Sequence, residues 1–401
     1  MTSNLRLKDF ILPLLYGAVM FWILIGLATF SGFRHFEKWS IHVLTFGCVV
    51  VLLRDRKGFG NPFRVRMPDW VRARWVEWGL VSFVLLATTV HLIKLHGWPL
   101  VEAWFQEDIV GTALVRQSII ARSGALMNYL SSFVIKAILP FSIVFMYLRK
   151  RKMMLGLVTA IGMFYALMLM QKSFMVTIFM PLLCILLLER KWLRLAGVAC
   201  LSVLGIVILL LVTNPQLLGR GKARDLPVIE NPFGTGLKGL AKRVLYVPGK
   251  VTGEWFDLVP AHYPYLNGCG YRFLQPLTGC EYVDYSRKLY DELFPEYKAL
   301  GLTGTVNVAS FVNDYANFGM RGVFLSGIVL AVLITLLTRL YHNREVYLIL
   351  FNLFPVIMLS SSAVSTLLFS GGWVVINLLF MVLNPYLPVL RFDNRKRLCV
   401  G

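Results

Sequence analysis

The sequence predicts an all-α, polytopic integral membrane protein with about ten transmembrane helices and one large ordered loop outside the membrane. Of its 401 residues, 57% are hydrophobic and 15% are charged, whereas a soluble domain carries about 25% charged residues. Apolar runs of roughly 17–25 residues, the length of a membrane-spanning helix, recur along most of the chain. The net charge of +20 is explained by Lys and Arg in cytoplasmic loops. No nucleic-acid-binding motif is visible, so nucleic acid is not an expected partner.

Ten apolar segments are predicted to span the membrane. In chain order they are residues 10–32, 39–53, 77–95, 125–148, 153–171, 173–188, 192–213, 322–338, 345–362 and 365–390. The pair that flanks Gln171 and Lys172 forms either two helices with a tight turn or one broken helix. The chain therefore divides into an N-terminal bundle of about seven spans (1–213), a large loop region (214–321), and about three C-terminal spans with a tail (322–401).

Basic residues in the short connections orient these spans. With the N-terminus inside, the inner connections hold 22 Lys and Arg residues, and the outer ones hold five, namely Arg34, Lys38, Lys94, Arg116 and Arg122. Because positive residues collect on the cytoplasmic side, both termini are predicted to be cytoplasmic. Long loops cross a membrane regardless of their charge, so the segment 214–321 does not enter this comparison, and it is predicted to lie outside.

Two outer segments are long enough to hold structure of their own. The segment 214–321 is rich in Pro, Gly and Tyr, and a loop of this size is usually ordered and functional. In the segment 96–124, the QSIIARSG end suggests a short interfacial helix. Cys269 and Cys280 share the longer segment and could pair in an oxidising compartment, although their spacing alone leaves the pairing open.

Clustered cations in the long segment suggest an anion site. GRGKAR places Arg220, Lys222 and Arg224 beside two Gly, and Arg272 and Arg321 follow later. Arg offers paired donors and Lys a compact charge to a phosphate or diphosphate. The alternative is a solvated surface that faces lipid headgroups, because the segment as a whole carries twelve basic and ten acidic residues.

Lys172 lies between two apolar runs, beside Gln171 and Ser173. Inside the membrane it would cost roughly 2.5–3.5 kcal/mol at the centre of a helix, and such residues usually face a cavity or a partner. At the tip of a helical hairpin, its ammonium group would reach water at little cost. Both placements stay open, and the first makes Lys172 a candidate for contact with an anionic substrate.

Three residues of the long segment are candidate general bases. Asp257 lies three residues after Glu254, so that the two would share one face of a short helix. Asp314 falls just before a predicted span, and His262 is the one His of the segment. A carboxylate near an apolar boundary can have a raised pKa, which suits proton transfer near neutral pH. Each residue alone also fits a helix cap, an ion pair or a solvated side chain.

Motifs of several other enzyme classes are missing from the sequence. It contains no HExxH, no GxSxG and no Walker loop. Paired Cys with metal-ligand spacing and an acidic triad typical of metal-dependent sugar-nucleotide enzymes are missing as well. We therefore expect no metal, no cofactor and no nucleotide-driven reaction.

Three stretches resemble segments of the bacterial Wzy-type polymerases, which join O-antigen and oligosaccharide repeat units. They are GEWFDLVPAHYPYLNGCGYRF (253–273), TVNVASFVNDYANFGMRGV (305–323) and KSFMVTIFMPLLCILL (172–187). The second stretch matches the family pattern of an acidic residue and Tyr before Asn-Phe-Gly and a new span; its matching residues are Asp314, Tyr315, Asn317, Phe318, Gly319 and Gly322. The family often has Glu in place of Asp314 and Arg in place of Lys172.

The resemblance implies a metal-independent, GT-C-like glycosyltransferase of the bacterial inner membrane that contributes to lipopolysaccharide. Such enzymes bind undecaprenyl-diphosphate-linked glycans on the periplasmic face. They transfer the growing chain to the non-reducing end of a new lipid-linked unit. A flippase and a chain-length regulator are the protein partners it would imply, and membrane lipid surrounds the site.

The resemblance also assigns roles to aromatic and polar residues of the long segment. Tyr263, Tyr265 and Tyr271 are expected to contact sugar, because aromatic faces stack on the apolar surface of sugar rings. An interfacial aromatic belt is the alternative for these three. Tyr315 and Asn317 are expected to contact sugar as well.

Two other functions remain open from the sequence. An O-antigen ligase would share the architecture and the donor but would transfer glycan to lipid A core; such ligases depend on a periplasmic His beside Arg, which His262 and Arg272 could provide. A flippase or other transporter of lipid-linked oligosaccharide would be expected to show internal repeats and charges in several spans, and neither is visible.

Overall fold

The computed structural model describes residues 10–54, 73–215, 246–392 and 398–400, and these are almost entirely helical. Six of the described helices are long and apolar enough to cross a bilayer: Ile11–Ser31, Phe36–Leu53, Arg74–Lys94, Ile109–Leu148, Trp192–Thr213 and Ser310–Leu340. Four shorter apolar helices accompany them: Lys152–Met168, Lys172–Leu188, Glu345–Met358 and Trp373–Tyr386. The prediction of an all-α polytopic membrane protein is confirmed at this level.

The chain forms two compact units, each assembled from separate parts of the sequence. The first unit comprises Met1–Pro62 and Val228–Leu367. Its described elements are α1 (Ile11–Ser31), α2 (Phe36–Arg54), α11 (Val247–Leu258), η4 (Arg272–Leu274), α12 (Gln275–Thr278), α13 (Tyr285–Leu293), α14 (Pro295–Ala299), α15 (Ser310–Leu340), α16 (Glu345–Met358) and α17 (Val364–Phe369), which crosses the boundary of the unit. All the described candidate site residues except Lys172 belong to this unit.

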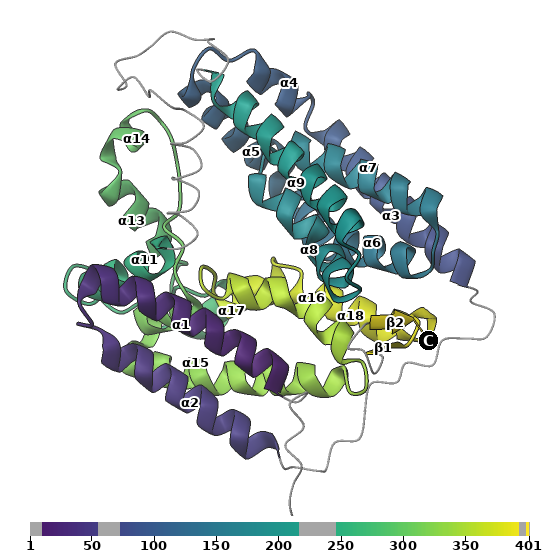
Figure 1. Cartoon of the computed structure of the whole chain (residues 1–401). Helices are drawn as coiled ribbons and strands as arrows, with labels where there is room; N and C mark the ends of the chain where they lie inside the picture. The colour runs from purple at the N-terminus through teal and green to yellow at the C-terminus, as the bar shows by residue number, and fades with distance from the viewer. Residues whose placement is uncertain (1–9, 55–72, 216–245, 393–397, 401) are drawn as a thin grey trace, which may run out of the picture. The chain divides into compact units, whose positions relative to one another are not determined.

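Small residues let the helices of the first unit approach closely. Gly26 of α1 faces Gly249 of α11, and a Cβ atom added to Gly249 would lie 2.4 Å from the Gly26 Cα. Gly327 of α15 similarly meets the backbone of α2 at the His42 carbonyl. Between apolar helices in lipid, close backbone packing is a main source of attraction. Figure 1 shows α1, α2 and α15 side by side, with α11 against α1.

The connection between α1 and α2 is short because α1 ends abruptly. Gly32 takes a left-handed conformation (φ 56°), and its N–H donates to the Ala28 carbonyl at 3.2 Å. This is a common helix end that only Gly adopts without strain. The chain then enters α2 at Phe36. As a result, Arg34 and His35 lie at the ends of two long helices.

Helix α15 begins before the predicted span 322–338, at Ser310, and it bends at Gly319 (φ 62°, ψ −145°). A Cβ atom at Gly319 would lie 3.2 Å from the Tyr265 ring. The left-handed conformation and the close ring both require Gly here. The segment from Asp314 to Asn317 is therefore helical and lies just before the bend.

The second unit comprises Phe63–Pro227 and Leu368–Gly401. Its described elements are α3 (Ala73–Lys94), α4 (Pro99–Trp104), α5 (Ile109–Phe133), η2 (Val134–Ile138), α6 (Leu139–Leu148), α7 (Lys152–Met168), α8 (Lys172–Leu188), α9 (Trp192–Thr213), α18 (Trp373–Leu383), η5 (Asn384–Tyr386) and the paired antiparallel strands β1 (Leu390–Phe392) and β2 (Leu398–Val400). The helical hairpin at Gln171 is thus two helices, not one broken helix. The expected interfacial helix QSIIARSG lies inside α5, which departs from helical geometry at Gly124.

The π-helical turn η2 has a local cause. Pro140 follows it and has no N–H to offer the carbonyl four residues earlier, at Lys136. A wider turn at this point is a usual response to such a gap in the helical ladder. The span predicted at 125–148 is accordingly part of a longer helical stretch, Ile109–Leu148.

Candidate functional site

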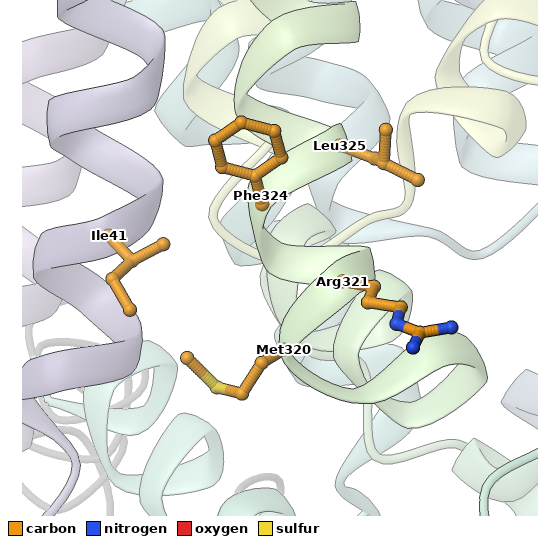
Figure 2. Close-up of a pocket in the computed structure, with 5 residues that line it drawn as sticks. All are labelled: Ile41, Met320, Arg321, Phe324 and Leu325. Carbon is orange, nitrogen blue, oxygen red and sulfur yellow. The ribbon is translucent and has the colours of Figure 1, made fainter.

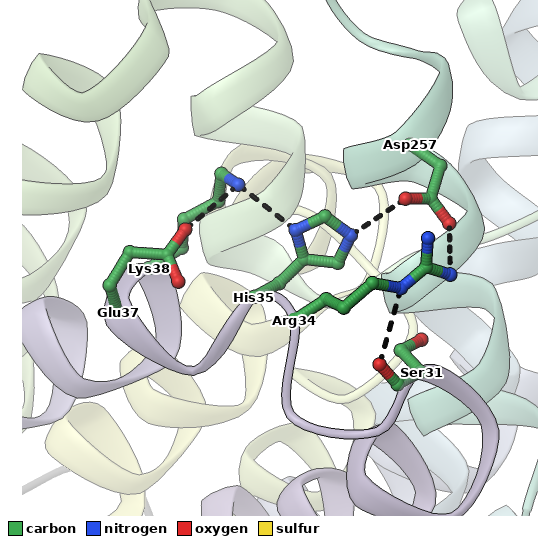
Figure 3. A network of polar contacts seen from close by, with 6 residues as sticks. All are labelled: Ser31, Arg34, His35, Glu37, Lys38 and Asp257. Carbon is green, nitrogen blue, oxygen red and sulfur yellow. Dashed lines mark hydrogen bonds and ion pairs between the residues drawn. The ribbon is translucent and has the colours of Figure 1, made fainter.

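A chain of polar contacts links the connection between α1 and α2 to α11 (Figure 3). Asp257, near the end of α11, accepts from His35 Nε2 at 2.9 Å on Oδ1 and from Arg34 at 3.4 Å on Oδ2. On the other side of the ring, Lys38 Nζ lies 3.0 Å from His35 Nδ1 and 3.1 Å from Glu37 Oε1. The two contacts to Asp257 join residues more than 200 positions apart in sequence.

The contacts on its two ring nitrogens indicate which tautomer a neutral His35 adopts. An ammonium group has only N–H donors, so Nδ1 of His35 must accept from Lys38. The neutral ring then carries its proton on Nε2, from which it donates to Asp257. Both oxygens of Asp257 are thus occupied by donors. In this state Asp257 holds His35 and Arg34 in place, and its predicted role as a base stays a prediction.

Aromatic rings surround the Lys38 ammonium. Its Nζ lies 5.1 Å from the Phe256 ring centroid and 5.5 Å from that of Tyr315. Such cation–π contacts stabilise a positive charge away from bulk water. The Tyr265 ring meets Tyr315 edge to face, and the two hydroxyls are 3.3 Å apart. One of the predicted sugar-contacting tyrosines, Tyr315, therefore lies beside a cation, and a second, Tyr265, contacts its ring.

Asp314 and Tyr271 form the second polar pair of this region. The Tyr271 hydroxyl donates to Asp314 Oδ1, and Tyr271 stacks on Phe318. Burial raises the pKa of the Tyr271 phenol far above its usual value, and the nearby Asp314 charge adds to the effect. The phenol is accordingly neutral and able to donate at physiological pH. Asp314 is partly buried, and it directly precedes Tyr315 on α15.

The segment between α11 and α12 docks on α15 through its backbone. Leu266 N–H donates to the Ala316 carbonyl at 3.0 Å, and Asn267 N–H donates to the Asn317 carbonyl at 2.8 Å. The fully buried Asn317 side chain accepts from Gly270 N–H at 3.0 Å. Its amide holds the segment in place, while its predicted contact with sugar stays a prediction.

A disulfide closes the same segment. Cys269 and Cys280 are bonded in the structure, which resolves the pairing that their spacing left open. The Cys269 carbonyl also accepts from Val283 N–H at 2.9 Å. The covalent link therefore lies two residues from Tyr271, the partner of Asp314.

Tyr263 and His262, the remaining candidates of this segment, have other recorded contacts. The Tyr263 hydroxyl donates to Glu292, and this bond raises the Tyr263 pKa to about 12. His262 is exposed, and its backbone N–H donates to the Leu258 carbonyl at 2.7 Å. Neither side chain is bonded to Asp314 or to Asp257 in the contacts described above, so their predicted roles stay predictions.

The predicted cations are dispersed. Arg272 is exposed and its guanidinium lies 4.6 Å from the Tyr282 ring centroid. Arg321 borders an apolar groove of about 520 Å³ lined by Ile41, Met320, Arg321, Phe324 and Leu325. Figure 2 shows the Arg321 side chain directed away from Ile41. Lys172 begins α8 in the other unit, and the GRGKAR residues Arg220, Lys222 and Arg224 lie outside the described residues.

Sequence reasoning missed Arg34, His35 and Lys38 as site residues. Arg34 and Lys38 entered the sequence analysis only as members of the five outer basic residues. The connection between the first two spans is short and is predicted to lie outside. Basic residues usually collect in the inner connections, yet this one carries two cations and a His. That departure is the feature of the sequence that could have identified them.

No protein-family model, curated protein or solved structure matches this chain. Among the described residues, no three His, Cys, Asp or Glu side chains gather in a way that could hold a metal ion.

Proposed function

We propose that this chain is an inner-membrane glycosyltransferase that polymerises undecaprenyl-diphosphate-linked oligosaccharide units on the periplasmic face. The observation that carries the proposal is that Asp314 directly precedes Tyr315 on α15, and that the Tyr315 ring contacts both Lys38 and Tyr265. Lys38 and Arg34 supply cations, Asp314 supplies a carboxylate next to a neutral Tyr271, and Tyr265 supplies an aromatic face. Cations stabilise a diphosphate leaving group. A carboxylate accepts the proton of an acceptor hydroxyl, and an aromatic face stacks on a sugar ring.

The proposed reaction assigns each group one task. The acceptor hydroxyl of a lipid-linked unit attacks the anomeric carbon of the donor chain, and the bond from that carbon to the diphosphate oxygen breaks. The diphosphate leaves with the electron pair, and nearby cations stabilise its charge. Asp314 takes the proton of the acceptor hydroxyl, either directly or through Tyr271. Asp257 keeps His35 and Arg34 in place.

The sidedness of the proposal rests on two independent features. The excess of basic residues in alternate connections favours cytoplasmic termini and a periplasmic segment 214–321. The Cys269–Cys280 disulfide lies in that segment, and disulfides persist in oxidising compartments such as the periplasm. A GT-C-like arrangement would place the site at this face.

Reaction of the purified chain with lipid-linked repeat units tests the proposal. We expect a ladder of products longer than one unit, still attached to undecaprenyl diphosphate. Asp314→Asn should abolish the ladder, whereas Asp291→Asn should keep it. Asp291 is a fair control because its partner is Lys298 in an exposed ion pair. Failure of the wild-type chain to extend the correct substrate beyond one unit would rule out a polymerase.

A second candidate, transfer of glycan to lipid A core, is favoured by one observation. His35 and Arg34 are adjacent in sequence and both bond to Asp257, and O-antigen ligases depend on a His beside Arg. The same reaction mixture, supplemented with lipid A core, separates the two functions by product. Capped core without longer lipid-linked chains would favour the ligase.

A further inference from the structure

Lys38 is held more tightly than an ordinary surface cation. Its side chain is 14% exposed, and its ammonium is fixed by His35 and two aromatic rings. The Glu37 side chain that completes its surroundings is 56% exposed. The cation is therefore held by buried groups, while its acidic partner is largely exposed to solvent.

We infer that Lys38 is the anion-binding group of this site and that Glu37 is its internal competitor. The Glu37 carboxylate occupies the position on Lys38 that a phosphate oxygen of the ligand takes. The inference rests on the proposed function for the identity of the ligand, a diphosphate carried by a lipid. The site itself would bind the phosphate group whatever its source.

The contacts of Lys38 explain why a ligand can displace Glu37 from it but not His35. Lys38 donates to His35, whose ring is held by Asp257 at 2.9 Å, so displacement of that contact would disrupt three groups together. Glu37 is held only by contacts local to the start of α2, namely Lys38 at 3.1 Å and its own backbone N–H. A diphosphate group carries more negative charge than a carboxylate, and its oxygens accept charge-assisted hydrogen bonds from ammonium. Exchange of one anion for another leaves the fixed part of the network intact.

Local charge makes the competition strong. Lys38 and Arg34 contribute two positive charges, and Glu37 and Asp257 contribute two negative charges. The cluster is neutral as long as Glu37 is near. When Glu37 moves away, the cluster has a net charge of one positive. The Lys38 ammonium, which lies beside aromatic rings, then attracts a ligand anion.

Substitutions at Glu37 and Lys38 should therefore act in opposite directions. Glu37→Gln keeps the size of the side chain but removes its charge, and we expect diphosphate to bind about 3- to 10-fold more tightly. Lys38→Met keeps the apolar stem over the Phe256 ring but removes the ammonium. Loss of a hydrogen bond to a charged group should weaken binding about 10- to 100-fold.

The test measures binding to the full chain in phosphatidylcholine nanodiscs with two probes, undecaprenyl diphosphate and inorganic diphosphate. Lys38-dependent binding of both probes would show that the phosphate group itself is recognised. Lys38-dependent binding of the lipid alone would show that the prenyl chain is also required. Either result supports the inference if Glu37→Gln tightens binding. Unchanged affinity of both probes in Lys38→Met, or no gain in Glu37→Gln, would overturn it.

Two controls keep the result interpretable. Glu37 lies in the first turn of α2, where an acidic side chain favours the helix, so Glu37→Gln should lower thermal stability slightly while it raises affinity. If Glu37 had only a structural role, the substitution would lower thermal stability without raising affinity. If Lys38→Met does not fold, Lys38→Arg, which keeps the charge, should retain at least part of the binding. Loss of polymerisation with intact Lys38-dependent binding would count against the proposed function alone.

Discussion

His35 is the residue on which the geometry of the site depends. Its ring lies between Lys38 and Asp257 and is 8% exposed. A neutral ring with its proton on Nε2 accepts from one neighbour and donates to the other. The orientation of the Lys38 ammonium therefore depends on a residue that need not touch the substrate.

Variants at His35 separate this positioning role from a structural one. His35→Phe keeps the ring but removes both bonds, and we expect kcat/KM to fall about 10- to 100-fold. His35→Gln supplies an amide oxygen for Lys38 and an N–H for Asp257, and it should recover much of the activity. Steady-state kinetics of the folded proteins provides the comparison. Equal losses in the two variants would indicate that ring packing, and not the pair of bonds, is what matters.

Tyr271 and Asp314 should differ in how strongly they affect the reaction. Asp314→Asn removes the proposed base, and kcat should fall by about 100-fold or more. Tyr271→Phe removes a neutral donor and keeps the ring that stacks on Phe318, so we expect a smaller loss of about 10-fold. Single-turnover rates with lipid-linked substrate measure both. A larger effect at Tyr271 than at Asp314 would mean that the phenol is the essential group.

At the scale of helices, the contact between α1 and α11 holds the site together. Gly249→Val would drive a branched side chain into the backbone of Gly26. We expect a loss of about 1–3 kcal/mol or more in stability and separation of Asp257 from His35. Gly17→Val on α1 is the matched control, because a Cβ atom at Gly17 meets nothing within 4 Å. Thermal unfolding of both variants in detergent checks the expectation, and equal stabilities would contradict it.

Several elements could be predicted from the sequence because their determinants are local. Long apolar runs are sufficient to indicate a helix in a membrane, and nine of the ten predicted spans each overlap one apolar helix. The prediction of a single span at 365–390 is wrong, because this segment is divided between α17 and α18 and reaches strand β1. The start of α15 was missed because residues 310–318 mix polar and apolar side chains and their helix is stabilised by docking of the segment 262–274. The bend at Gly319 lies close to the Tyr265 ring, a proximity that no local pattern reveals.

The candidate site was predictable only in part, because some of its contacts join residues far apart in sequence. Asp314, Tyr271, Tyr265 and Tyr315 share motifs that could be found by inspection, and the structure brings them together. The partner of Asp257 could not be found in this way, since His35 lies 222 residues away. Pairing over such a distance is decided by helix packing and leaves no trace in local composition.

At the scale of the whole molecule, the disulfide reports the compartment of the long segment. In intact wild-type cells, a membrane-impermeant maleimide should label Cys269 only after reduction. In a Cys280→Ser variant, it should label Cys269 without reduction. The reason is that the bridged sulfurs do not react, whereas a free thiol in the periplasm is accessible. Mass spectrometry of the labelled peptide provides the measurement. Labelling that requires permeabilised cells would place the segment on the cytoplasmic side.

Release of undecaprenyl diphosphate during chain growth tests the proposed glycosyl transfer most directly. If each new linkage is formed by attack on a lipid-diphosphate-linked chain, one molecule of undecaprenyl diphosphate must be released for every linkage. The purified chain should therefore release the lipid in proportion to product length, and Asp314→Asn should release almost none. Growth of chains without matching release, or equal release by wild type and Asp314→Asn, would contradict the assignment of this site as a polymerase.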